Sequence, residues 1–370
     1  MRLAMVIFKY FPYGGLQRDM LRMAQTALKR GHAVTVFASS WSGPRPGGCE
    51  VRLLPVKALT NHGALQQFAV QAIRETRGFD AVLMFNRMAG GDFYFAADNC
   101  LELETAKKHS RLVMALHPRY RVFLSQERAV FSPQAATRVF YIAPRQKDDY
   151  MRVYGTPPER FIYLPPGIDP AFRDMHAATA LRARKRMELG LGADSLMVIT
   201  IGFHKNGERV IRALAALPET IRSRCRCYLV GEAWPWLYAR LAERLGVLKQ
   251  VIFTGGREDV PELLCAADLM AHPARNEATG TVLLEAIACG LPVLCGAECG
   301  FHNFVADTTG LVVAAGAPQA EFDALLASAL SRLPELREKT LAYAANADFY
   351  RRADVAIDAI EEFARGQGRA

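Results

Sequence analysis

The chain has 370 residues, 51% of them hydrophobic and 22% charged, so it is too long for one ordinary core and has the composition of a water-soluble α/β protein of about two domains. No apolar run approaches the roughly 20 residues that a membrane-spanning helix needs, and the apolar start at residues 3–8 is too short for a signal peptide. The net charge of +9 is uneven, because residues 1–170 hold 23 Lys and Arg against 13 Asp and Glu, whereas residues 171–370 hold 23 against 24. We therefore expect a cytoplasmic protein whose basic half suits nucleic acid, an anionic membrane or a phosphorylated acceptor, or is an ordinary solvated surface.

The first half alternates short apolar runs with amphipathic stretches. Strand-like runs are expected at residues 3–8, 33–38, 51–54, 81–85 and 138–142, and residues 17–29 have the pattern of an amphipathic helix. This alternation predicts a doubly wound parallel sheet.

A stiff segment divides the chain, since Leu164-Pro165-Pro166-Gly167-Ile168-Asp169-Pro170 contains three prolines and a glycine. We predict a first domain over residues 1–168, a second over residues 169–350, and a final helix over residues 351–370 that returns to the first domain.

The same alternation recurs after residue 195. Strands are expected at residues 197–201, 227–230, 251–253, 269–271, 292–295 and 311–313. Helices are expected to begin near Gly207, Pro235, Val260 and Gly280, and two or three more over residues 336–365. The predicted fold class is therefore α/β with two Rossmann-like domains, and ligand is expected between them, at the carboxyl ends of the strands.

The cysteines and carboxylates give no metal-binding pattern. Eight cysteines form no CxxC pair and mostly lie in apolar segments, so reduced core thiols are expected. Cys295, Cys299 and His302 have no fourth partner for zinc, and no Asp-x-Asp is present to hold a metal-bound diphosphate. No metal or cofactor is expected.

The segment Arg275-Asn276-Glu277-Ala278-Thr279-Gly280-Thr281-Val282-Leu283-Leu284-Glu285-Ala286 carries the most information about function. Glu277 falls in a turn of small residues, and Glu285 lies two helical turns further along an apolar stripe. The backbone N–H groups of a helix start suit a phosphate or sugar oxygen, and a carboxylate in the second turn suits a ribose diol. Two glutamates eight positions apart also arise by chance on a solvated face, so the spacing alone is not specific.

Three loops before predicted helices are further candidates. In Lys9-Tyr10-Phe11-Pro12-Tyr13-Gly14-Gly15, the two glycines let backbone approach an anion, although a simple turn also uses glycines. Asp98 closes the run Asp92-Phe93-Tyr94-Phe95-Ala96-Ala97-Asp98, where it faces a reacting sugar or caps a helix. Thr60-Asn61-His62-Gly63 is a similar helix entry, in which His62 is a cap or turn residue on the simpler interpretation.

A fourth loop, Thr254-Gly255-Gly256-Arg257, follows a strand in the second half, and its backbone at Arg257 is well placed to read a flat base edge.

Together these segments resemble the retaining, GT-B-fold glycosyltransferases of family 4, and more narrowly the bacterial lipopolysaccharide core glucosyltransferase I (WaaG) type. The similarity runs over nearly the whole chain. Its most specific pieces are residues 9–19, 60–63, 92–98, 158–161, 164–168 and 275–286.

The resemblance implies a UDP-sugar donor, in particular UDP-glucose, held mainly by the second domain, and a heptose of the lipopolysaccharide inner core as acceptor on the first. It implies that Glu285 holds the ribose and that the backbone of Arg257 holds the uracil. It places Gly14 and Gly15 at the diphosphate, and Glu277 at the glucose hydroxyls with the backbone of Ala278, Thr279, Gly280 and Thr281. Asp98 is implied beside the anomeric carbon in a same-face displacement without a protein nucleophile, and acceptor contacts are expected from Asp19, Asn61 and His62.

One departure concerns the leaving group. Family members have an Arg-Lys-Gly tripeptide after the first strand of the second domain, and its two cations bind the diphosphate. This chain has Gly202-Phe203-His204-Lys205-Asn206-Gly207-Glu208-Arg209 instead. Because charge-assisted contacts to phosphate are each worth about 1.5–3 kcal/mol, we expect Lys205 and Arg209 to substitute from shifted positions. The alternatives are a different donor or acceptor, or a degenerate member that binds without efficient transfer.

The stretch from residue 101 to residue 130 mixes basic with apolar side chains, as a helix lying on an anionic leaflet does, although an ordinary solvated helix is the alternative. The resemblance implies peripheral attachment to the cytoplasmic face of the inner membrane. Nucleic acid is not expected, because the basic half has no recognisable binding motif.

Overall fold

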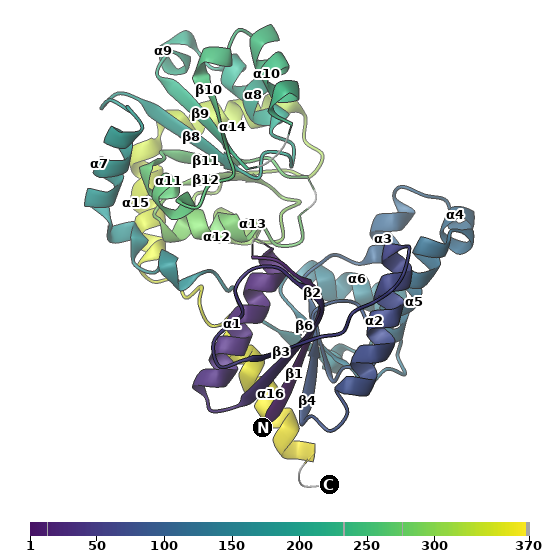
Figure 1. Ribbon diagram of the computed structural model, residues 1–370. Coiled ribbons are helices and arrows are strands. Elements are labelled where there is room, and N and C mark those ends of the chain that lie inside the picture. The colour runs from purple at the N-terminus through teal and green to yellow at the C-terminus, as the bar shows by residue number, and fades with distance from the viewer. Residues whose placement is uncertain (13, 232–233, 276, 368–370) are drawn as a thin grey trace. The chain divides into compact units, whose positions relative to one another are not determined.

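The computed structural model describes residues 1–12, 14–231, 234–275 and 277–367, so Tyr13 and Asn276 of the motifs above lie outside the described residues. The chain divides into two compact units, the first made of Met1–Gly167 with Arg351–Ala370 and the second of Ile168–Tyr350 (Figure 1). The division falls within one residue of the expected boundary, at residue 167 instead of 168. Among the described residues, no helix has the length and apolar character needed to cross a membrane.

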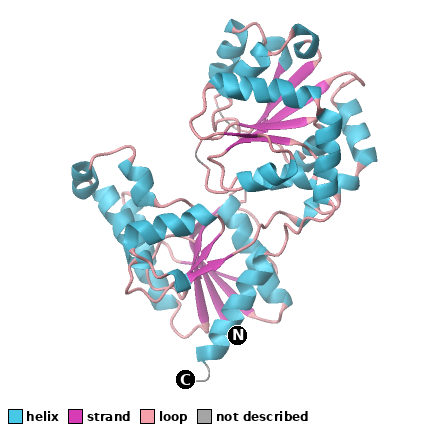
Figure 2. Ribbon diagram, turned by 180° about the vertical axis from the view of Figure 1, so that it is seen from behind, coloured by secondary structure: helices cyan, strands magenta, loops and turns pink. Residues whose placement is uncertain are grey.

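The first unit is built on a seven-stranded sheet in the order β3-β2-β1-β4-β5-β6-β7, in which every neighbouring pair is parallel. Its strands are β1 (Arg2–Tyr10), β2 (Ala33–Trp41), β3 (Glu50–Leu53), β4 (Ala81–Met84), β5 (Phe93–Ala96), β6 (Arg138–Tyr141) and β7 (Phe161–Tyr163). Helices cover both faces of this sheet (Figure 2), which is why residues 3–7 of the interior strand β1 form an unbroken buried apolar run.

The helices of the first unit include one from the end of the chain. They are α1 (Gly15–Lys29), α2 (Asn61–Glu75), α3 (Leu101–Ala106), α4 (Arg111–Leu116), α5 (Pro118–Phe131), α6 (Pro144–Tyr154) and α16 (Arg352–Gln367). α16 packs beside α1 (Figure 1), with Ile357 and Ile360 in the core and Arg30 paired to Asp354 and Asp358. The returning helix is therefore part of the first unit.

The second unit is built on a six-stranded parallel sheet in the order β10-β9-β8-β11-β12-β13. Its strands are β8 (Leu196–Ile201), β9 (Cys225–Val230), β10 (Val251–Gly255), β11 (Leu269–His272), β12 (Val293–Gly296) and β13 (Val312–Val313). Its α-helices are α7 (Thr179–Glu188), α8 (Glu208–Ala216), α9 (Glu219–Arg222), α10 (Pro235–Arg244), α11 (Val260–Ala266), α12 (Thr281–Ala288), α13 (His302–Thr308), α14 (Gln319–Ser331) and α15 (Leu333–Ala344). The predicted fold class, two Rossmann-like α/β domains, is confirmed.

Two expectations about elements were wrong. Residues 93–96 were assigned to a loop, but they form β5, which pairs with β4 and β6 and is fully buried. The amphipathic stretch at residues 101–130 is three helices, α3 to α5, because Ser110 and His117 each cap the start of a new helix.

Candidate active site

Two loops of the second unit meet where the order of its strands reverses. β8 leads into residues 202–207 and β11 into residues 273–280, and these neighbouring strands are the switch point of the sheet. Open α/β sheets bind ligands in the crevice at such a point, beyond the carboxyl ends of the strands. Lys205 Nζ forms an ion pair with Glu277 Oε1 across it, and their side chains are 40% and 13% exposed. A cation and a carboxylate therefore meet at the expected ligand position.

The other carboxylate oxygen of Glu277 is held by a histidine. His272 is the last residue of β11, and its Nε2 lies 2.5 Å from Glu277 Oε2 with its side chain 2% exposed. Burial by itself would raise the pKa of Glu277, but the hydrogen bond and charge of His272, together with Lys205, lower it to about 2. The carboxylate is therefore ionised at neutral pH and can only accept hydrogen bonds.

The backbone after Glu277 is shaped by glycine. Gly280 is the N-cap residue of α12 and has φ of 75°, a left-handed conformation that favours glycine. The loop pairs with residues 298–301, where Phe301 N donates to Thr279 O at 2.7 Å and Gly300 N donates to Glu277 O at 3.1 Å. A Cβ on Gly300 would lie 1.9 Å from Ala278 O, so only glycine permits this approach. Residues 278–280 are thus fixed directly ahead of Thr281, the first residue of α12.

Glu285 lies in the second turn of α12 and is 7% exposed. Its carboxylate is on the same helix whose start follows Glu277, as the spacing in the sequence predicts.

The loop that carries Lys205 also contains a strained residue. Asn206 has φ of 81°, which asparagine tolerates better than most side chains, and its amide Nδ2 donates to Pro273 O at 3.1 Å. Burial, followed by the charge of Lys205, lowers the pKa of His204, so this neighbouring imidazole does not supply a second cation at neutral pH. Lys205 is the cation of this loop.

Arg209 does not join this cluster. It lies in α8 with 5% exposure, donates through Nη2 to Ala317 O and Pro318 O at 3.2 Å, and stacks over the ring of Phe322. Its guanidinium packs against α14, so we remove Arg209 from the candidate phosphate contacts and keep Lys205.

Arg257 lies in the loop between β10 and α11. The guanidinium of Arg257 is bound to Asp259, with Nε to Oδ1 at 2.7 Å and Nη2 to Oδ2 at 2.6 Å. Gly231 N donates to Gly255 O at 2.9 Å, which joins the ends of β9 and β10. The side chain of Arg257 is therefore occupied by its own loop.

His272, Glu277 and Cys299 have potential ligand atoms within 4.8 Å of one another, and they are the one such group among the described residues. Lys205 already balances the charge of Glu277, and burial raises the pKa of the Cys299 thiol far above its ordinary value. In the structure Glu277 is bound by His272 and by Lys205, and Cys299 Sγ lies 3.7 Å from Ala274 O.

In the first unit, Gly14 and Gly15 lie directly after β1, which neighbours β4 at the switch point of that sheet. A Cβ on Gly14 would collide with Gln17, 1.8 Å from Oε1, whereas a Cβ on Gly15 would meet no protein atom within 4 Å. A side chain at position 14 would therefore displace Gln17, whereas the space beside Gly15 is open.

Asp98 follows β5, and its carboxylate is exposed while its backbone carbonyl is bound by buried side chains. Its carbonyl oxygen accepts from Gln146 Nε2 at 3.3 Å and from Tyr150 Oη at 3.4 Å, and both of those side chains are buried. Arg87 Nη1 lies 3.6 Å from Asp98 Oδ2, whose side chain is 72% exposed. The backbone of Asp98 is therefore held by buried side chains, while its carboxylate is exposed to solvent.

Of the three expected acceptor residues, Asp19 is bound by arginines, and Asn61 and His62 lie at the start of α2. Asp19 is bound by Arg22 at 3.2 Å and by the buried Arg352 at 3.1 Å, so it ties α1 to α16 and the interpretation as an acceptor ligand is replaced by a structural one. Asn61 is the first residue of α2, and His62 Nε2 lies 3.3 Å from Oγ1 of Thr60, which caps the helix. The structure therefore gives these two residues a place at a helix start.

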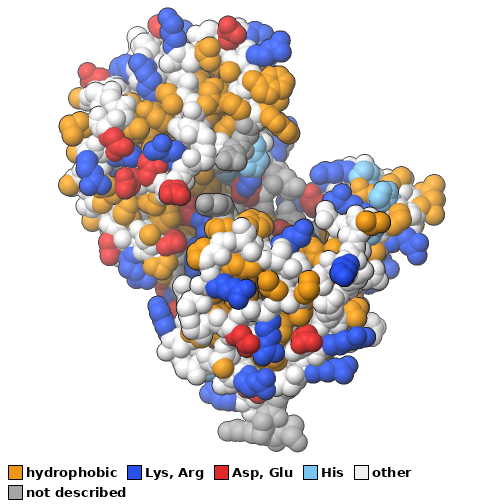
Figure 3. Space-filling model, in the orientation of Figure 1, with side chains coloured by type: hydrophobic (Ala, Val, Ile, Leu, Met, Phe, Trp, Pro, Cys, Tyr) orange, Lys and Arg blue, Asp and Glu red, His pale blue; other side chains and the backbone are white. Residues whose placement is uncertain are grey.

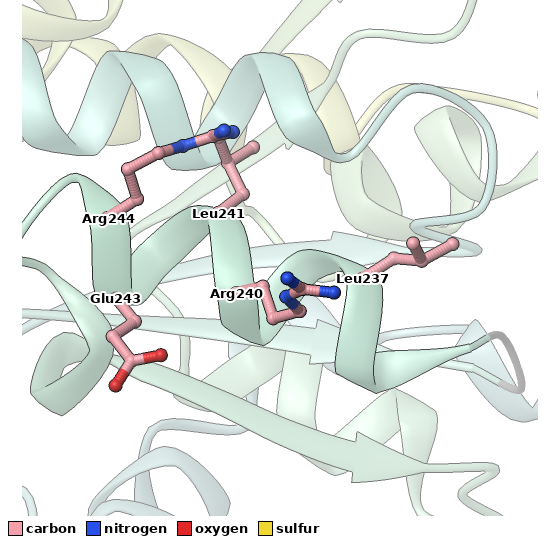
Figure 4. A pocket seen from close by; sticks show the side chains of 5 residues that line it. All are labelled: Leu237, Arg240, Leu241, Glu243 and Arg244. Atoms are coloured by element: carbon pink, nitrogen blue, oxygen red, sulfur yellow. The ribbon is translucent and has the colours of Figure 1, made fainter.

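A surface cavity of about 420 Å³ lies elsewhere in the second unit, on α10 (Figure 4). It is lined by Leu237, Arg240, Leu241, Glu243 and Arg244, none of which belongs to the cluster around Glu277.

The chain matches two families of known proteins. Residues 13–172 match Glycosyltransferase Family 4, and residues 192–347 match Glycosyl transferases group 1.

Curated relatives and solved structures agree with these matches. The chain is 40% identical to the lipopolysaccharide glucosyltransferase WaaG of Escherichia coli K12, over 97% of this chain and 98% of that protein. It is 28% identical to the D-inositol 3-phosphate glycosyltransferase of Xylanimonas cellulosilytica, over 84% and 82% of the two chains. A crystal structure of WaaG superimposes with a TM-score of 0.89, 39% identity and coverage of 97% and 99%. The UDP complex of HepE from Anabaena gives a TM-score of 0.74 at 18% identity with full coverage of both chains, which shows a shared fold. The chain therefore belongs to the family 4 glycosyltransferases of the WaaG type and has their GT-B fold.

Proposed function

We propose that this protein transfers glucose from UDP-glucose to a heptose of the lipopolysaccharide inner core, with retention of the anomeric configuration and without a metal ion. The observation that carries the proposal is the ion pair between Lys205 and Glu277 at the switch point of the second sheet. A cation beside a carboxylate suits a leaving diphosphate next to sugar hydroxyls, which supports these roles for the two side chains. The similarity to WaaG supports the choice of donor and acceptor.

On the donor side, Lys205 binds the diphosphate. Lys205 and Asn206 correspond to the Lys and Gly of the family's Arg-Lys-Gly, because Asn206 has the positive φ that a glycine adopts readily. On this correspondence, one of the two expected cations is retained. The open space beside Gly15 leaves room for a phosphate to approach backbone.

Glu277 accepts from the glucose hydroxyls, because an ionised carboxylate offers only acceptors, and the backbone of residues 278–281 lies beside it at the start of α12. Glu285 accepts from the ribose diol, and the backbone at Arg257 contacts the uracil edge.

In the transfer step, the acceptor hydroxyl attacks the anomeric carbon on the face that the diphosphate leaves. The leaving phosphate oxygen takes the proton of that hydroxyl, so the bond to phosphate breaks as the new glycosidic bond forms. Asp98 stabilises positive charge on the sugar, and Lys205 stabilises negative charge on the diphosphate. Asn61 and His62, at the start of α2, contact the acceptor.

The protein works at the cytoplasmic face of the inner membrane and binds it through α4 and α5. Leu112 and Leu116 are 68% and 67% exposed, and both lie in α4. Lys and Arg side chains gather with hydrophobic ones on the segment of α3 to α5 (Figure 3). The exposed basic residues of this segment include Lys107, Lys108, Arg111, Arg119 and Arg121. Exposed leucines within a basic surface suit insertion into an anionic leaflet.

The test is turnover of purified protein with UDP-glucose and a core acceptor truncated at the heptose, with and without a chelator. We expect a mass gain of one hexose, an α-linked product by NMR, and no effect of the chelator. Parallel reactions with UDP-galactose, UDP-N-acetylglucosamine and GDP-mannose identify the donor. Transfer from one of these but not from UDP-glucose would refute the proposed donor, and absence of transfer from all would refute the activity.

A further inference from the structure

The carboxylate of Glu277 has two protein partners that differ in mobility. His272 Nε2 bonds Oε2 at 2.5 Å from a side chain that is 2% exposed, at the end of a strand that pairs on both sides. Lys205 bonds Oε1 from a flexible side chain that is 40% exposed. His272 is therefore the fixed partner of the carboxylate, and Lys205 is the partner that is free to move.

The backbone of the loop does not depend on His272. Residues 277–280 are held by the hydrogen bonds from Gly300 N to Glu277 O and from Phe301 N to Thr279 O, and by the fit of Gly300 against Ala278. The feature that these contacts leave undetermined is the orientation of the Glu277 carboxylate. The imidazole of His272 supplies that constraint.

Burial of His272 at this position is unfavourable for the stability of the fold if the ring serves only for packing. Its Nδ1 is buried and has no hydrogen-bond partner among the described residues. An apolar side chain would fill the strand end without burying an unsatisfied polar nitrogen, which is unfavourable. The one hydrogen bond that the ring makes, to Glu277, is thus its distinguishing interaction.

We infer that His272 is a positioning residue for the donor sugar: its Nε2–H fixes Glu277 so that the other oxygen accepts from a sugar hydroxyl once Lys205 moves to the diphosphate. This inference rests on the proposed function, because it takes Glu277 as the sugar-binding carboxylate. An ionised carboxylate oxygen accepts two hydrogen bonds, so both oxygens remain usable while His272 stays in place. Binding of the nucleotide alone does not require this contact, whereas binding of the sugar does.

The experiment compares the affinities for UDP-glucose and for UDP, by calorimetry, in three variants of the full chain. His272→Phe keeps a ring and removes the donor, and His272→Asn places its amide near the position of Nδ1, too far back to reach Glu277. His272→Gln reaches the position of Nε2 and restores an N–H donor. The control is Thr200→Val, which removes another buried hydrogen bond to β11, from Thr200 Oγ1 to Ala271 O at 2.8 Å.

We expect His272→Phe and His272→Asn to weaken the affinity for UDP-glucose by about ten-fold or more, since one charge-assisted hydrogen bond is lost. The affinity for UDP should change by less than about two-fold. His272→Gln should recover most of the affinity for UDP-glucose, and kcat should fall and recover in parallel. Thr200→Val should keep the wild-type ratio of the two affinities. Adding His272→Asn to Glu277→Gln should produce no further change in that ratio.

Equal weakening of UDP and UDP-glucose in His272→Asn, an unchanged ratio, or additive effects in the double variant would each overturn the inference. If His272→Phe does not fold, the comparison of His272→Asn with His272→Gln decides the question alone. Failure of the proposed function would be seen separately, as wild-type protein that does not distinguish UDP-glucose from UDP.

Discussion

Arg87 and Glu127 form an ion pair with 2.9 Å between Nε and Oε1, in which the carboxylate of Glu127 is fully buried. Glu127 also accepts from Leu101 N at 2.8 Å and from Glu102 N at 3.0 Å, so it caps the start of α3. Arg87 donates to Asn99 O at 2.6 Å. The two side chains therefore hold the segment that begins at Asp98, and Glu127 lies in α5, one of the two helices of the proposed membrane surface.

Breaking this pair should destabilise the first unit and slow transfer. Removal of one partner of a buried ion pair costs about 3–5 kcal/mol, because the other charge stays buried. We expect Glu127→Ala to lower the free energy of unfolding, measured with urea, by that amount, and to lower kcat because Asp98 loses its support. The exposed pair of Arg332 with Glu335 provides the control, and Glu335→Ala should change neither quantity appreciably. A Glu127→Ala variant with wild-type stability would contradict this account of the network.

Lys205 and Arg209 should differ in effect although both are basic residues near one loop. Lys205→Met removes the cation at the switch point, so UDP affinity and kcat should each fall about ten-fold or more, as for loss of a charge-assisted phosphate contact. Arg209→Met breaks contacts with Ala317 and Pro318 instead, so it should lower the melting temperature and leave UDP affinity nearly unchanged. If calorimetry showed weaker UDP binding in Arg209→Met and unchanged UDP binding in Lys205→Met, Arg209 and not Lys205 would be the phosphate contact.

The contrast between these two residues shows what the sequence could predict. Glu277, Glu285 and the glycines after β1 are placed by spacing within one strand-loop-helix unit, so the pattern locates them correctly relative to the elements. Arg209 and Asp19 are engaged by Ala317 and Arg352, more than 100 and 300 positions away, and no local pattern reveals such partners. His272 was missed because its role depends on a contact with Glu277 that only the end of β11 creates. β5 was missed because four apolar residues carry too little periodicity to separate a buried strand from a loop.

Glu285 should control binding of the nucleoside and not of the sugar. Glu285→Gln keeps the size of this buried side chain and removes its charge. We expect the affinities for UDP and UDP-glucose to fall together, by about ten-fold, since the ribose is common to both ligands. Binding of both ligands at wild-type strength would remove Glu285 from the donor site. Calorimetry with uridine monophosphate and with inorganic diphosphate distinguishes the ribose contact from a change in the diphosphate site.

Leu112 and Leu116 should be required for membrane binding but not for chemistry. Replacing both by serine removes two exposed apolar side chains from α4 and leaves the surrounding basic residues in place. We expect the fraction of protein that sediments with vesicles containing anionic lipid to fall several-fold, because each leucine buried in the bilayer contributes about 1.5–3 kcal/mol to the free energy of binding. Turnover of a soluble, delipidated acceptor should not change. Leu59→Ser, at an exposed leucine outside α4, is the matched control and should bind vesicles as the wild type does.

The ionised state of Glu277 should appear in the pH dependence of stability. Its pKa of about 2 in the folded protein lies below its ordinary value of 4.5, so the folded state binds this proton less readily than the unfolded state. The resulting stabilisation is fully present above about pH 4.5 and is lost as the pH falls through about 2. Glu277→Gln removes the contribution, on the order of 3 kcal/mol. The difference in unfolding free energy between wild type and this variant should therefore stay nearly constant from pH 6 to about 4.5 and shrink as the pH falls from there toward 2. Glu219→Gln, in the exposed ion pair with Arg222, is the reference for a surface carboxylate. A difference that stays constant or grows as the pH falls from about 4.5 toward 2 would show that His272 and Lys205 do not stabilise the charged form.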